Sequence, residues 1–448
     1  MQFEKFHLLL WCKKQISEFQ TDMAKIQIIS KNITPFGGVF FVNEEFNRSG
    51  LRNLIDKELG IRISTKGYSY GNLIGNFFNL RLSGGECAED IQRHFRPTLE
   101  QIPGNEVASA DTLLRCFNEL AVDNTTVVST SDKKYRFNIN EKLNELNIKS
   151  LILTKQLEKG ELYDFDYDNQ IIEHEKFDAA KTYKMNTGYF PGIATIGNKI
   201  VYVENRDGNA NVKTAQEETL ERCYMLLNKN KLYVNRSRMD AGSYGEEIIK
   251  VIAKYSRLFY IRANKCESLT ETVRQITDWQ TVEINFKEYK VASVPFTNFL
   301  AEQNYRLVIM REKTVDPQLD LFEGEKFNYR CILTNDRQST EKEVIEYYNQ
   351  RGASEKTFDI QNNDFGWNHL PTSNMNSNTA YLILTAMLKN FYNYLVVKVS
   401  GIFSDILPGS RLKRFIFRFI SVPGQYVYRS RHRTLQLYTD RPYEKMVT

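Results

Sequence analysis

The spacing of apolar residues divides the chain into two kinds of region. Between residues 33 and 120, short apolar runs at helical spacing are separated by turns such as Gly37-Gly38, Gly84-Gly85 and Pro103-Gly104. This pattern predicts a compact helical domain. From residue 161 the period changes to two, and segments rich in Tyr, Ile, Val and Phe predict strands at 161–168, 181–189 and 199–204.

The elements that follow predict how these strands are organised. Helical and strand patterns alternate at residues 214–227, 232–240, 244–254 and 258–262. Three strands followed by helix, strand, helix and strand is the order of a ribonuclease-H-like core, so we expect an α/β fold. Strand patterns at 282–286, 289–294 and 306–310 then predict a β-rich insertion, because a helical pattern returns only at residue 341.

These patterns divide the chain into six expected segments. They are an N-terminal extension (1–30), a helical domain that contains a candidate DNA-binding helix (31–125), the first part of the ribonuclease-H-like core (126–263), the β-rich insertion (264–330), the last part of the core (331–403) and a basic C-terminal segment (404–448). Within the helical domain, residues 109–120 begin with a capping serine and carry Arg115. Such a segment is typical of the second helix of a helix-turn-helix, or of an ordinary capped helix.

Composition narrows the class of protein. The 448 residues include six widely spaced cysteines and five histidines, a set that indicates neither a zinc site nor a disulfide framework. The most apolar stretch, residues 381–403, is interrupted by lysine and asparagine and predicts a buried helix, not a membrane span. The apolar run near the N-terminus is followed by Lys13 and Lys14 instead of a cleavage site. We therefore expect a cytoplasmic protein without a membrane partner.

Positive charge is concentrated near the C-terminus. The net charge is only +5, but residues 411–433 contain seven Arg or Lys residues and no acid, interleaved with five aromatic residues. Basic residues among aromatic ones suit phosphate contacts and base stacking, although a solvated helix face or a partner surface has the same composition. Besides Arg115, the candidate DNA-contacting residues are Arg411, Lys413 and Arg414.

Acidic residues end two of the predicted strands. Alternation places Asp164, Asp166 and Asp168 on one face of the strand at 161–168, an arrangement that a cation would relieve. Asp240 closes a later strand and precedes Ser243-x-x-Glu246, a pattern that predicts a capping box. Taken singly, such acids are also common in solvated turns and near helix caps.

A third acid lies on the helix predicted beyond residue 341. Tyr348, Arg351 and Glu355 are spaced i, i+3 and i+7, so they share one helical face. An isolated Arg-Glu pair at this spacing is also an ordinary surface pair. Together with the other acids, however, Glu355 provides the hard oxygen ligands that two Mg²⁺ ions need for phosphodiester cleavage, about 3.5–4 Å apart.

In their joint order these residues resemble the DDE transposases of bacterial insertion sequences. Tyr348, Arg351 and Glu355 match three positions of the Tyr-x2-Arg-x3-Glu-x6-Lys signature of one such group. The wider pattern is similar to insertion-sequence family 1380. The stretches that carry this resemblance include Thr34-Pro35-Phe36-Gly37-Gly38, Gly67-Tyr68-Ser69-Tyr70, Gly84-Gly85-Glu86-Cys87, Ser109-Ala110-Asp111-Thr112-Leu113-Leu114-Arg115, Asp164-Phe165-Asp166, Arg238-Met239-Asp240, Thr334-Asn335 and Tyr348-Asn349-Gln350-Arg351.

The resemblance implies a role for each site residue. Asp166, Asp240 and Glu355 would be the catalytic carboxylates and the ligands of two Mg²⁺ ions, for which Mn²⁺ could substitute. Asp164 is the alternative for the first position and a further candidate ligand. Arg351 would contact a phosphate, and Tyr348 would help to hold the transposon end.

The chain departs from the signature at two positions. Asn362 stands where the group usually has Lys, and Asp168 stands where it commonly has Thr. The first change replaces a charged phosphate contact by a neutral one, and the second adds either a metal ligand or only negative charge.

The resemblance also implies an activity and partners. The protein would nick DNA at terminal inverted repeats and join the freed 3′-hydroxyl to target DNA, as a homodimer in a synaptic complex, in the bacterial cytoplasm at the nucleoid. Two alternatives are a transposase-derived DNA-binding protein that is catalytically silent and a ribonuclease-H-like structure-selective nuclease.

Overall fold

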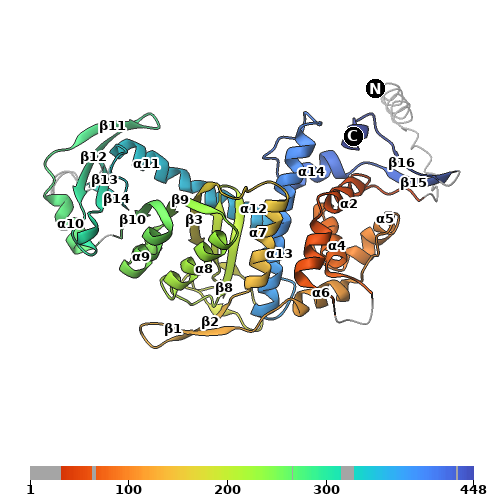
Figure 1. Ribbon diagram of the computed structural model, residues 1–448, viewed down its shortest axis with the longest axis horizontal. Helices are drawn as coiled ribbons and strands as arrows, with labels where there is room; N and C mark the ends of the chain where they lie inside the picture. The colour runs from red at the N-terminus through yellow and green to blue at the C-terminus, as the bar shows by residue number, and fades with distance from the viewer. Residues whose placement is uncertain (1–31, 63–66, 265, 314–326, 430–431, 448) are drawn as a thin grey trace, which may run out of the picture. The chain divides into compact units, whose positions relative to one another are not determined.

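A long mixed sheet runs through the computed structural model, which describes residues 32–62, 67–264, 266–313, 327–429 and 432–447 (Figure 1). The N-terminal extension expected at residues 1–30 lies outside the described residues. The strand order of this 11-stranded sheet is β1-β2-β8-β7-β3-β9-β10-β14-β13-β12-β11. Its strands are β1 (Thr125–Val128), β2 (Lys134–Asn138), β3 (Leu162–Asn169), β7 (Gly192–Ile196), β8 (Lys199–Arg206), β9 (Tyr233–Met239), β10 (Ser256–Arg262), β11 (Gln280–Ile284), β12 (Lys287–Pro295), β13 (Arg306–Lys313) and β14 (Phe327–Thr334).

The middle of the sheet contains five of the strands in the order β8-β7-β3-β9-β10. β3 is parallel to β9 and β9 is parallel to β10, whereas β7 is antiparallel to both of its neighbours. The strands predicted at 161–168, 199–204, 232–240 and 258–262 are confirmed as β3, β8, β9 and β10. Because β3 and β9 are parallel neighbours, their C-terminal ends lie at the same edge of the sheet.

The prediction that residues 181–189 form a strand of this sheet is wrong. That segment contributes β5 (Ala180–Lys181) and β6 (Thr187–Tyr189) to a separate three-stranded sheet with β4 (Ile172–Glu173). β7 takes its place beside β3. All five residues of β7 are buried, so it lacks the alternation by which half-exposed strands are found.

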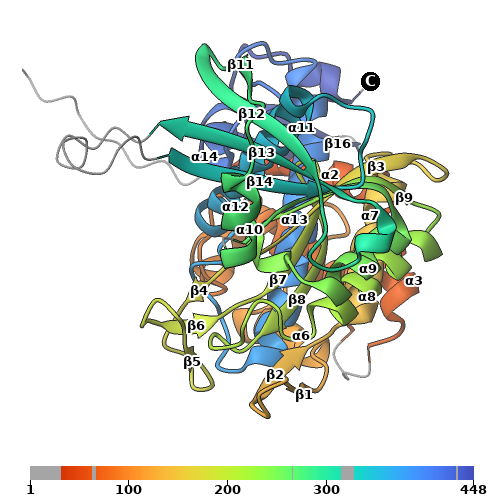
Figure 2. The same ribbon diagram turned by 90° about the vertical axis from the view of Figure 1, so that its left-hand side faces the viewer.

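The β-rich region continues the central sheet. The strands predicted at 282–286, 289–294 and 306–310 are confirmed as β11, β12 and β13. β14 pairs with β13 on one side and with β10 on the other, both antiparallel, so this region extends the sheet at its β10 edge (Figure 2). The predicted boundary at residue 330 falls within β14.

The helices of the described residues include those predicted at 109–120, 214–227 and 244–254, and also two, at 141–153 and 267–274, that were not predicted from the sequence. They are α2 (Val39–Arg48), α3 (Leu51–Leu59), α4 (Tyr70–Leu82), α5 (Arg96–Leu99), α6 (Ala110–Glu119), α7 (Glu141–Leu153), α8 (Gln216–Lys229), α9 (Glu246–Tyr255), α10 (Glu267–Arg274), α11 (Glu341–Asn349), α12 (Ala353–Asp364), α13 (Met375–Ser400) and α14 (Leu412–Phe415). Shorter turns are η1 (Ile91–Phe95), η2 (Ala241–Ser243), η3 (Ala301–Gln303), η4 (Gln350–Gly352), η5 (Ile416–Ile420) and η6 (Tyr443–Met446).

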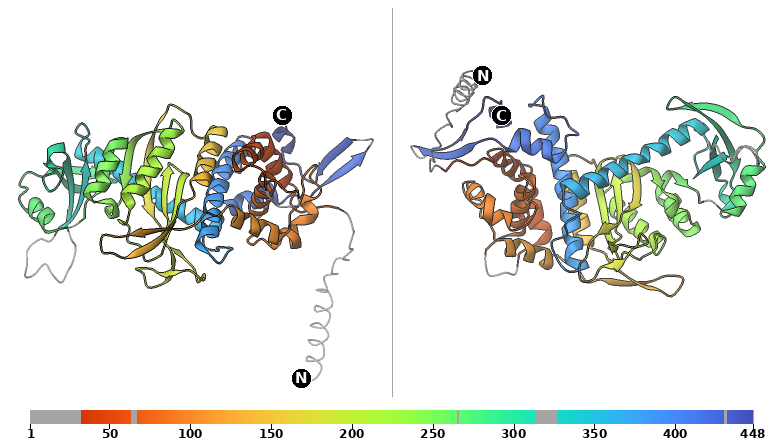
Figure 3. Two further views of the ribbon diagram at one scale, coloured as in Figure 1. Left: turned by 60° about the horizontal axis from the view of Figure 1, so that its bottom comes forward. Right: turned by 180° about the vertical axis from the view of Figure 1, so that it is seen from behind.

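The two faces of β3 have different surroundings. Phe165 and Tyr167 are fully buried in one hydrophobic core together with residues of α8 and α9, and the Phe165 ring lies 4.8 Å from that of Tyr224. Because side chains alternate along a strand, the acids at 164, 166 and 168 point to the opposite face. α11 and α12 lead from the β11–β14 end of the sheet toward α13 (Figure 3).

Local capping explains some helix starts and corrects one prediction. The Ser109 side chain accepts from the Thr112 amide and caps α6, as predicted. The capping box expected at Ser243 is wrong, because Ser243 lies in η2 and α9 begins after Gly245 without a side-chain cap. The 243–246 spacing matched the motif, but the extra turn η2 intervenes.

One hydrophobic core joins the N-terminal helices, α13 and the C-terminal segment. β15 (Gly424–Arg429) and β16 (His432–Leu437) form a hairpin beside the start of the described chain, where Thr34 and Gly424 exchange backbone hydrogen bonds. Gly38 touches the same segment, and a Cβ there would lie 2.1 Å from the Phe419 carbonyl oxygen. The helical domain and the basic segment therefore share their packing and do not form separate cores.

The long buried helix predicted at 381–403 is confirmed as α13. Within the described residues, no helix has the length and apolar character needed to cross a membrane.

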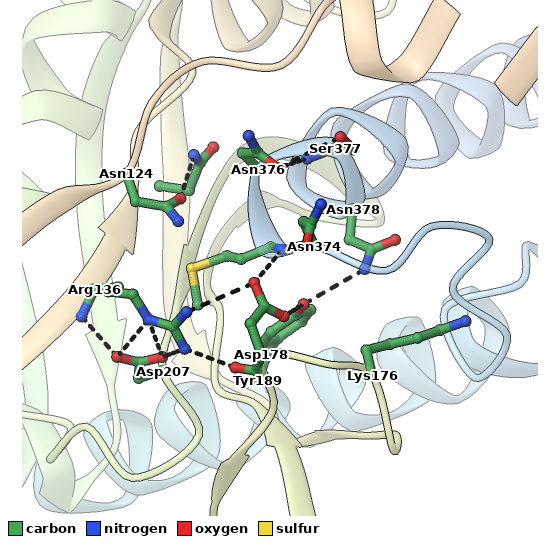
Figure 4. Close-up of polar contacts among 12 residues, drawn as sticks. Asn124, Arg136, Lys176, Asp178, Tyr189, Asp207, Asn374, Asn376, Ser377 and Asn378 are labelled. Atoms are coloured by element: carbon green, nitrogen blue, oxygen red, sulfur yellow. Dashed lines mark hydrogen bonds and ion pairs between the residues drawn. The ribbon is translucent and has the colours of Figure 1, made fainter. Parts of the chain in front are cut away.

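The start of α13 is attached to the small sheet by a polar cluster (Figure 4). Asp178 accepts hydrogen bonds from the Met375 amide, at 2.7 Å, and from the Tyr189 hydroxyl. Arg136 lies between Asp178 and Asp207, 3.7 Å from the first carboxylate and 2.7 Å from the second. A carboxylate at the helix N-terminus also meets the favourable end of the helix dipole.

Candidate active site

The parallel register of β3 and β9 brings two acids together. Tyr167 pairs with Met239, and Asp168 and Asp240 are the next residues along each strand. Parallel strands end at the same edge of a sheet, where α/β proteins place functional groups. Asp240 also accepts a hydrogen bond of 2.9 Å from the Gly242 amide, which fixes its carboxylate at the start of η2.

Asp168 lies close to both a positive and a negative side chain. Burial raises the pKa of Asp168 to about 6, against the lowering effect of the Arg351 guanidinium and with a further raising effect of the Asp240 carboxylate. The ion pair between Asp168 and Arg351 is 2.7 Å long, and its side chains are 20% and 14% exposed. The coupling between Asp168 and Asp240 is the repulsion that a divalent cation would remove.

The other two acids of β3 are each bound by an arginine of β9. The Asp166 carboxylate accepts two hydrogen bonds of 2.7 Å from Arg238. Arg236 forms the equivalent bidentate pair with Asp164, at 2.9 and 2.6 Å. Both guanidinium groups lie over the Tyr347 ring, 4.0 Å (Arg236) and 4.7 Å (Arg238) from its centre. Asp166 thus lies on the expected face, and its carboxylate is occupied by an internal cation.

The segment with the signature residues is bent by a 3₁₀ turn. Tyr348 lies on α11, Arg351 on η4 and Glu355 on α12, so the single helix predicted for them is interrupted. Burial raises the pKa of Tyr348 to about 12, and its protonated hydroxyl donates to the Met239 carbonyl at 3.2 Å. Tyr348 and Arg351 therefore reach the ends of both strands. The Glu355 side chain lies outside the described residues.

Two carboxylates of the described chain, those of Asp168 and Asp240, meet at this edge. No group of three His, Cys, Asp or Glu residues that could hold a metal is found among the described residues. Asp168 and Asp240 do fit a hard divalent cation chemically, since they are neighbouring oxygen donors with mutually unfavourable charge.

Arg411, predicted to contact DNA, is occupied by internal partners. Its guanidinium forms two hydrogen bonds of 2.8 Å with Asp364 and one of 2.7 Å with Asp359. These bonds attach the start of α14 to the end of α12. Arg411 therefore has a structural role that the run of basic residues concealed.

The other basic candidates differ in their surroundings. Arg115 on α6 and Lys413 on α14 are exposed. Arg414 is also exposed but donates to the Asp405 carbonyl at 2.8 and 3.2 Å. These three remain accessible to a large anionic partner.

The aromatic residues of the basic segment are only partly available for stacking. Phe415 and Phe419 are fully buried in the shared core, whereas Phe417 and Tyr428 are 70% and 68% exposed. Arg418 lies over the Phe417 ring, 5.3 Å from its centre. The aromatic residues of this segment thus form two sets, one buried in the core and one exposed to solvent.

Sequence reasoning missed the arginines of β9. Arg236 and Arg238 alternate toward Asp240 with the same period of two as Asp164, Asp166 and Asp168. In parallel pairing, Asp164 and Asp166 lie opposite Arg236 and Arg238, and both segments then end in an acid. This complementary pattern is visible in the sequence, but it can be recognised only once the two strands are known to be neighbours.

Comparison with protein families places the chain in one of them. The family described as "Transposase DDE domain group 1" matches residues 20–448. A solved structure of a piggyBac transposase synaptic complex with hairpin DNA is similar at 14% identity, covering 86% of this chain and 78% of that chain with a TM-score of 0.41. No curated protein sequence matches. Matched over nearly its whole length, the chain belongs to the transposase DDE domain family, group 1.

Proposed function

We propose that this protein cuts DNA at the ends of a mobile element and joins the freed 3′-hydroxyl to target DNA. The observation that carries the proposal is the meeting of Asp168 and Asp240 at the ends of adjacent parallel strands, with the Arg351 turn packed against them. The family assignment supports phosphodiester chemistry at such a site.

The catalytic acids of the proposal are Asp166, Asp240 and Glu355, with Asp164 and Asp168 as further acids of β3. The sequence resemblance favours Asp166, whereas the electrostatic coupling with Asp240 favours Asp168. These carboxylates would hold Mg²⁺ or Mn²⁺, which would activate the attacking oxygen and stabilise the departing one. Arg351 orients the Asp168 carboxylate and supplies positive charge beside it.

The core would be ribonuclease-H-like. The strand order β8-β7-β3-β9-β10, with β3, β9 and β10 parallel, supports this assignment, as does the position of the acids at one edge. α2 to α6 would read a terminal inverted repeat, with the exposed Arg115, Lys413 and Arg414 among the phosphate contacts.

The biological setting extends the same proposal. The element would be a bacterial insertion sequence resembling family 1380, and two copies of the protein would pair two element ends in the cytoplasm at the nucleoid. A two-fold dimer is the default symmetry for such an assembly.

The test is cleavage of a labelled duplex that carries the inverted repeat flanking the coding region. We expect nicking in Mg²⁺ by the unmodified protein, and its loss in Asp240→Asn and Glu355→Gln with DNA binding retained. Glu218→Gln serves as the matched control, because Glu218 is exposed on α8 outside the site.

Each result has a defined meaning. Loss of cleavage in Asp166→Asn with DNA binding retained, but not in Asp168→Asn, would assign the first catalytic position to Asp166, and the reverse result would assign it to Asp168. Tight end binding without metal-dependent cleavage would overturn the enzyme proposal in favour of a silent DNA-binding protein. Nicking without strand transfer would indicate a nuclease.

A further inference from the structure

A small cavity lies beside α12. It has a volume of about 220 Å³ and is bounded by the β7–β8 turn, α12, α13 and the segment that precedes α14. Its lining includes Lys356, Lys389 and Arg411 and no described Asp or Glu. The volume is below the roughly 300–1,000 Å³ of sites for drug-sized ligands, so the cavity suits a single chemical group.

Lys389 is the unusual member of this lining. It is 2% exposed, although it lies in the middle of α13, and its amino group donates to the Asn198 carbonyl. No ion pair joins it to a carboxylate in the described chain. Burial lowers the pKa of Lys389 to about 7, and the positive charge of Lys199 contributes. A lysine buried without a counter-ion is unfavourable unless an anion reaches it.

The other two cations of the lining, Arg411 and Lys356, differ in whether a carboxylate neutralises them. Arg411 is neutralised by Asp364 and Asp359. Lys356 is exposed on the first turn of α12, and within the described residues it forms no ion pair. Lys356 therefore brings an uncompensated positive charge to the cavity, and Lys389 brings an amino group that an anion would keep protonated, while the Thr357 side chain adds a hydroxyl to the lining.

We propose that this cavity binds one phosphate group of the DNA backbone through Lys356 and Lys389. Lysine ammonium groups bind phosphate as point charges and need no planar geometry. Because Lys356 directly follows Glu355, a phosphate bound here would hold the strand next to the site where it is cut. This location rests on the proposed function, whereas the phosphate site itself does not.

The experiment compares the full-length protein with Lys389→Met and Lys356→Gln. The first replaces a buried cation by a side chain of similar length, and the second changes an exposed side chain that does not support the fold. Lys142→Met is the matched control, because Lys142 is an exposed lysine on α7 outside the cavity. Binding of duplex DNA is measured over a range of salt concentrations, and binding of inorganic phosphate is measured by calorimetry.

We expect each cavity variant to lower the slope of log K against log salt by about 0.9, the value for one lost phosphate contact. Inorganic phosphate should bind the unmodified protein and the Lys142→Met control, and bind both cavity variants at least about tenfold more weakly. Unchanged DNA slopes with weaker phosphate binding would overturn the DNA assignment and indicate a free phosphate. Unchanged phosphate binding would overturn the site itself.

The outcomes separate this inference from the proposed function. Altered slopes in a protein that never cleaves DNA would support the phosphate site and contradict the enzyme proposal. Normal cleavage with unaltered slopes and unaltered phosphate binding would do the opposite. If Lys389→Met did not fold, Lys356→Gln alone would decide.

Discussion

Replacing Lys389 by methionine should stabilise the protein by an amount that depends on pH. The pKa of Lys389 is lowered from 10.5 to about 7, mainly because the ammonium group is buried. Between these two values the unfolded chain binds the proton more strongly, so this lysine's contribution to stability rises with pH. The pH-dependent cost of burying Lys389 is about 4 kcal/mol at pH 7 and about 2 kcal/mol at pH 9. The Lys389→Met variant escapes this cost.

The measurement is the free energy of urea unfolding at pH 7 and pH 9 for the unmodified protein, Lys389→Met and the Lys142→Met control. The stabilisation by Lys389→Met should be larger at pH 7 by about 2 kcal/mol, whereas the control should show no such difference. An equal effect of Lys389→Met at both pH values would refute the reasoning, because it would mean that Lys389 titrates normally in the folded protein.

Three further substitutions test the contacts described above. Asp166→Asn should lower the free energy of unfolding by about 3–5 kcal/mol in a urea titration, because Arg238 keeps its charge and loses its carboxylate; an unchanged midpoint would contradict that pairing. Asp178→Asn should destabilise the start of α13 by about 1–3 kcal/mol, seen as faster hydrogen exchange there than in the unmodified protein. Arg411→Ala should lower the melting temperature, whereas Lys413→Ala should leave it unchanged and weaken DNA binding; the reverse pattern would show that Arg411 serves DNA and not the fold.

The arginines of β9 neutralise most of the negative charge of β3. Asp164 and Asp166 are each bound by an arginine, so the accumulated charge of β3 is neutralised internally except at its end. At that end, Asp168 pairs with Arg351, but burial and the nearby charge of Asp240 still raise the pKa of Asp168 to about 6. A divalent cation would therefore gain most at the end of β3, where compensation is incomplete.

Much of the local structure was readable from the sequence. Alternation predicted β3, β9 and the face on which the acids lie, and polar interruptions predicted that α13 is a buried helix. Ser109 predicted the start of α6. These features depend on residues close together in the chain, whose periodicity and hydrogen-bonding groups act over one or two turns.

Tertiary structure decided which distant segments became neighbours. β7, and not residues 181–189, pairs with β3 in the central sheet. Arg238 donates hydrogen bonds to Asp166, and Arg411 donates to Asp364 and is not available as a surface charge. Likewise, nothing adjacent to Lys389 in sequence indicates that its amino group is buried beside Asn198. Register, topology and the exclusion of water set these contacts, and they determine which charges are compensated inside the protein and which remain free to bind a partner.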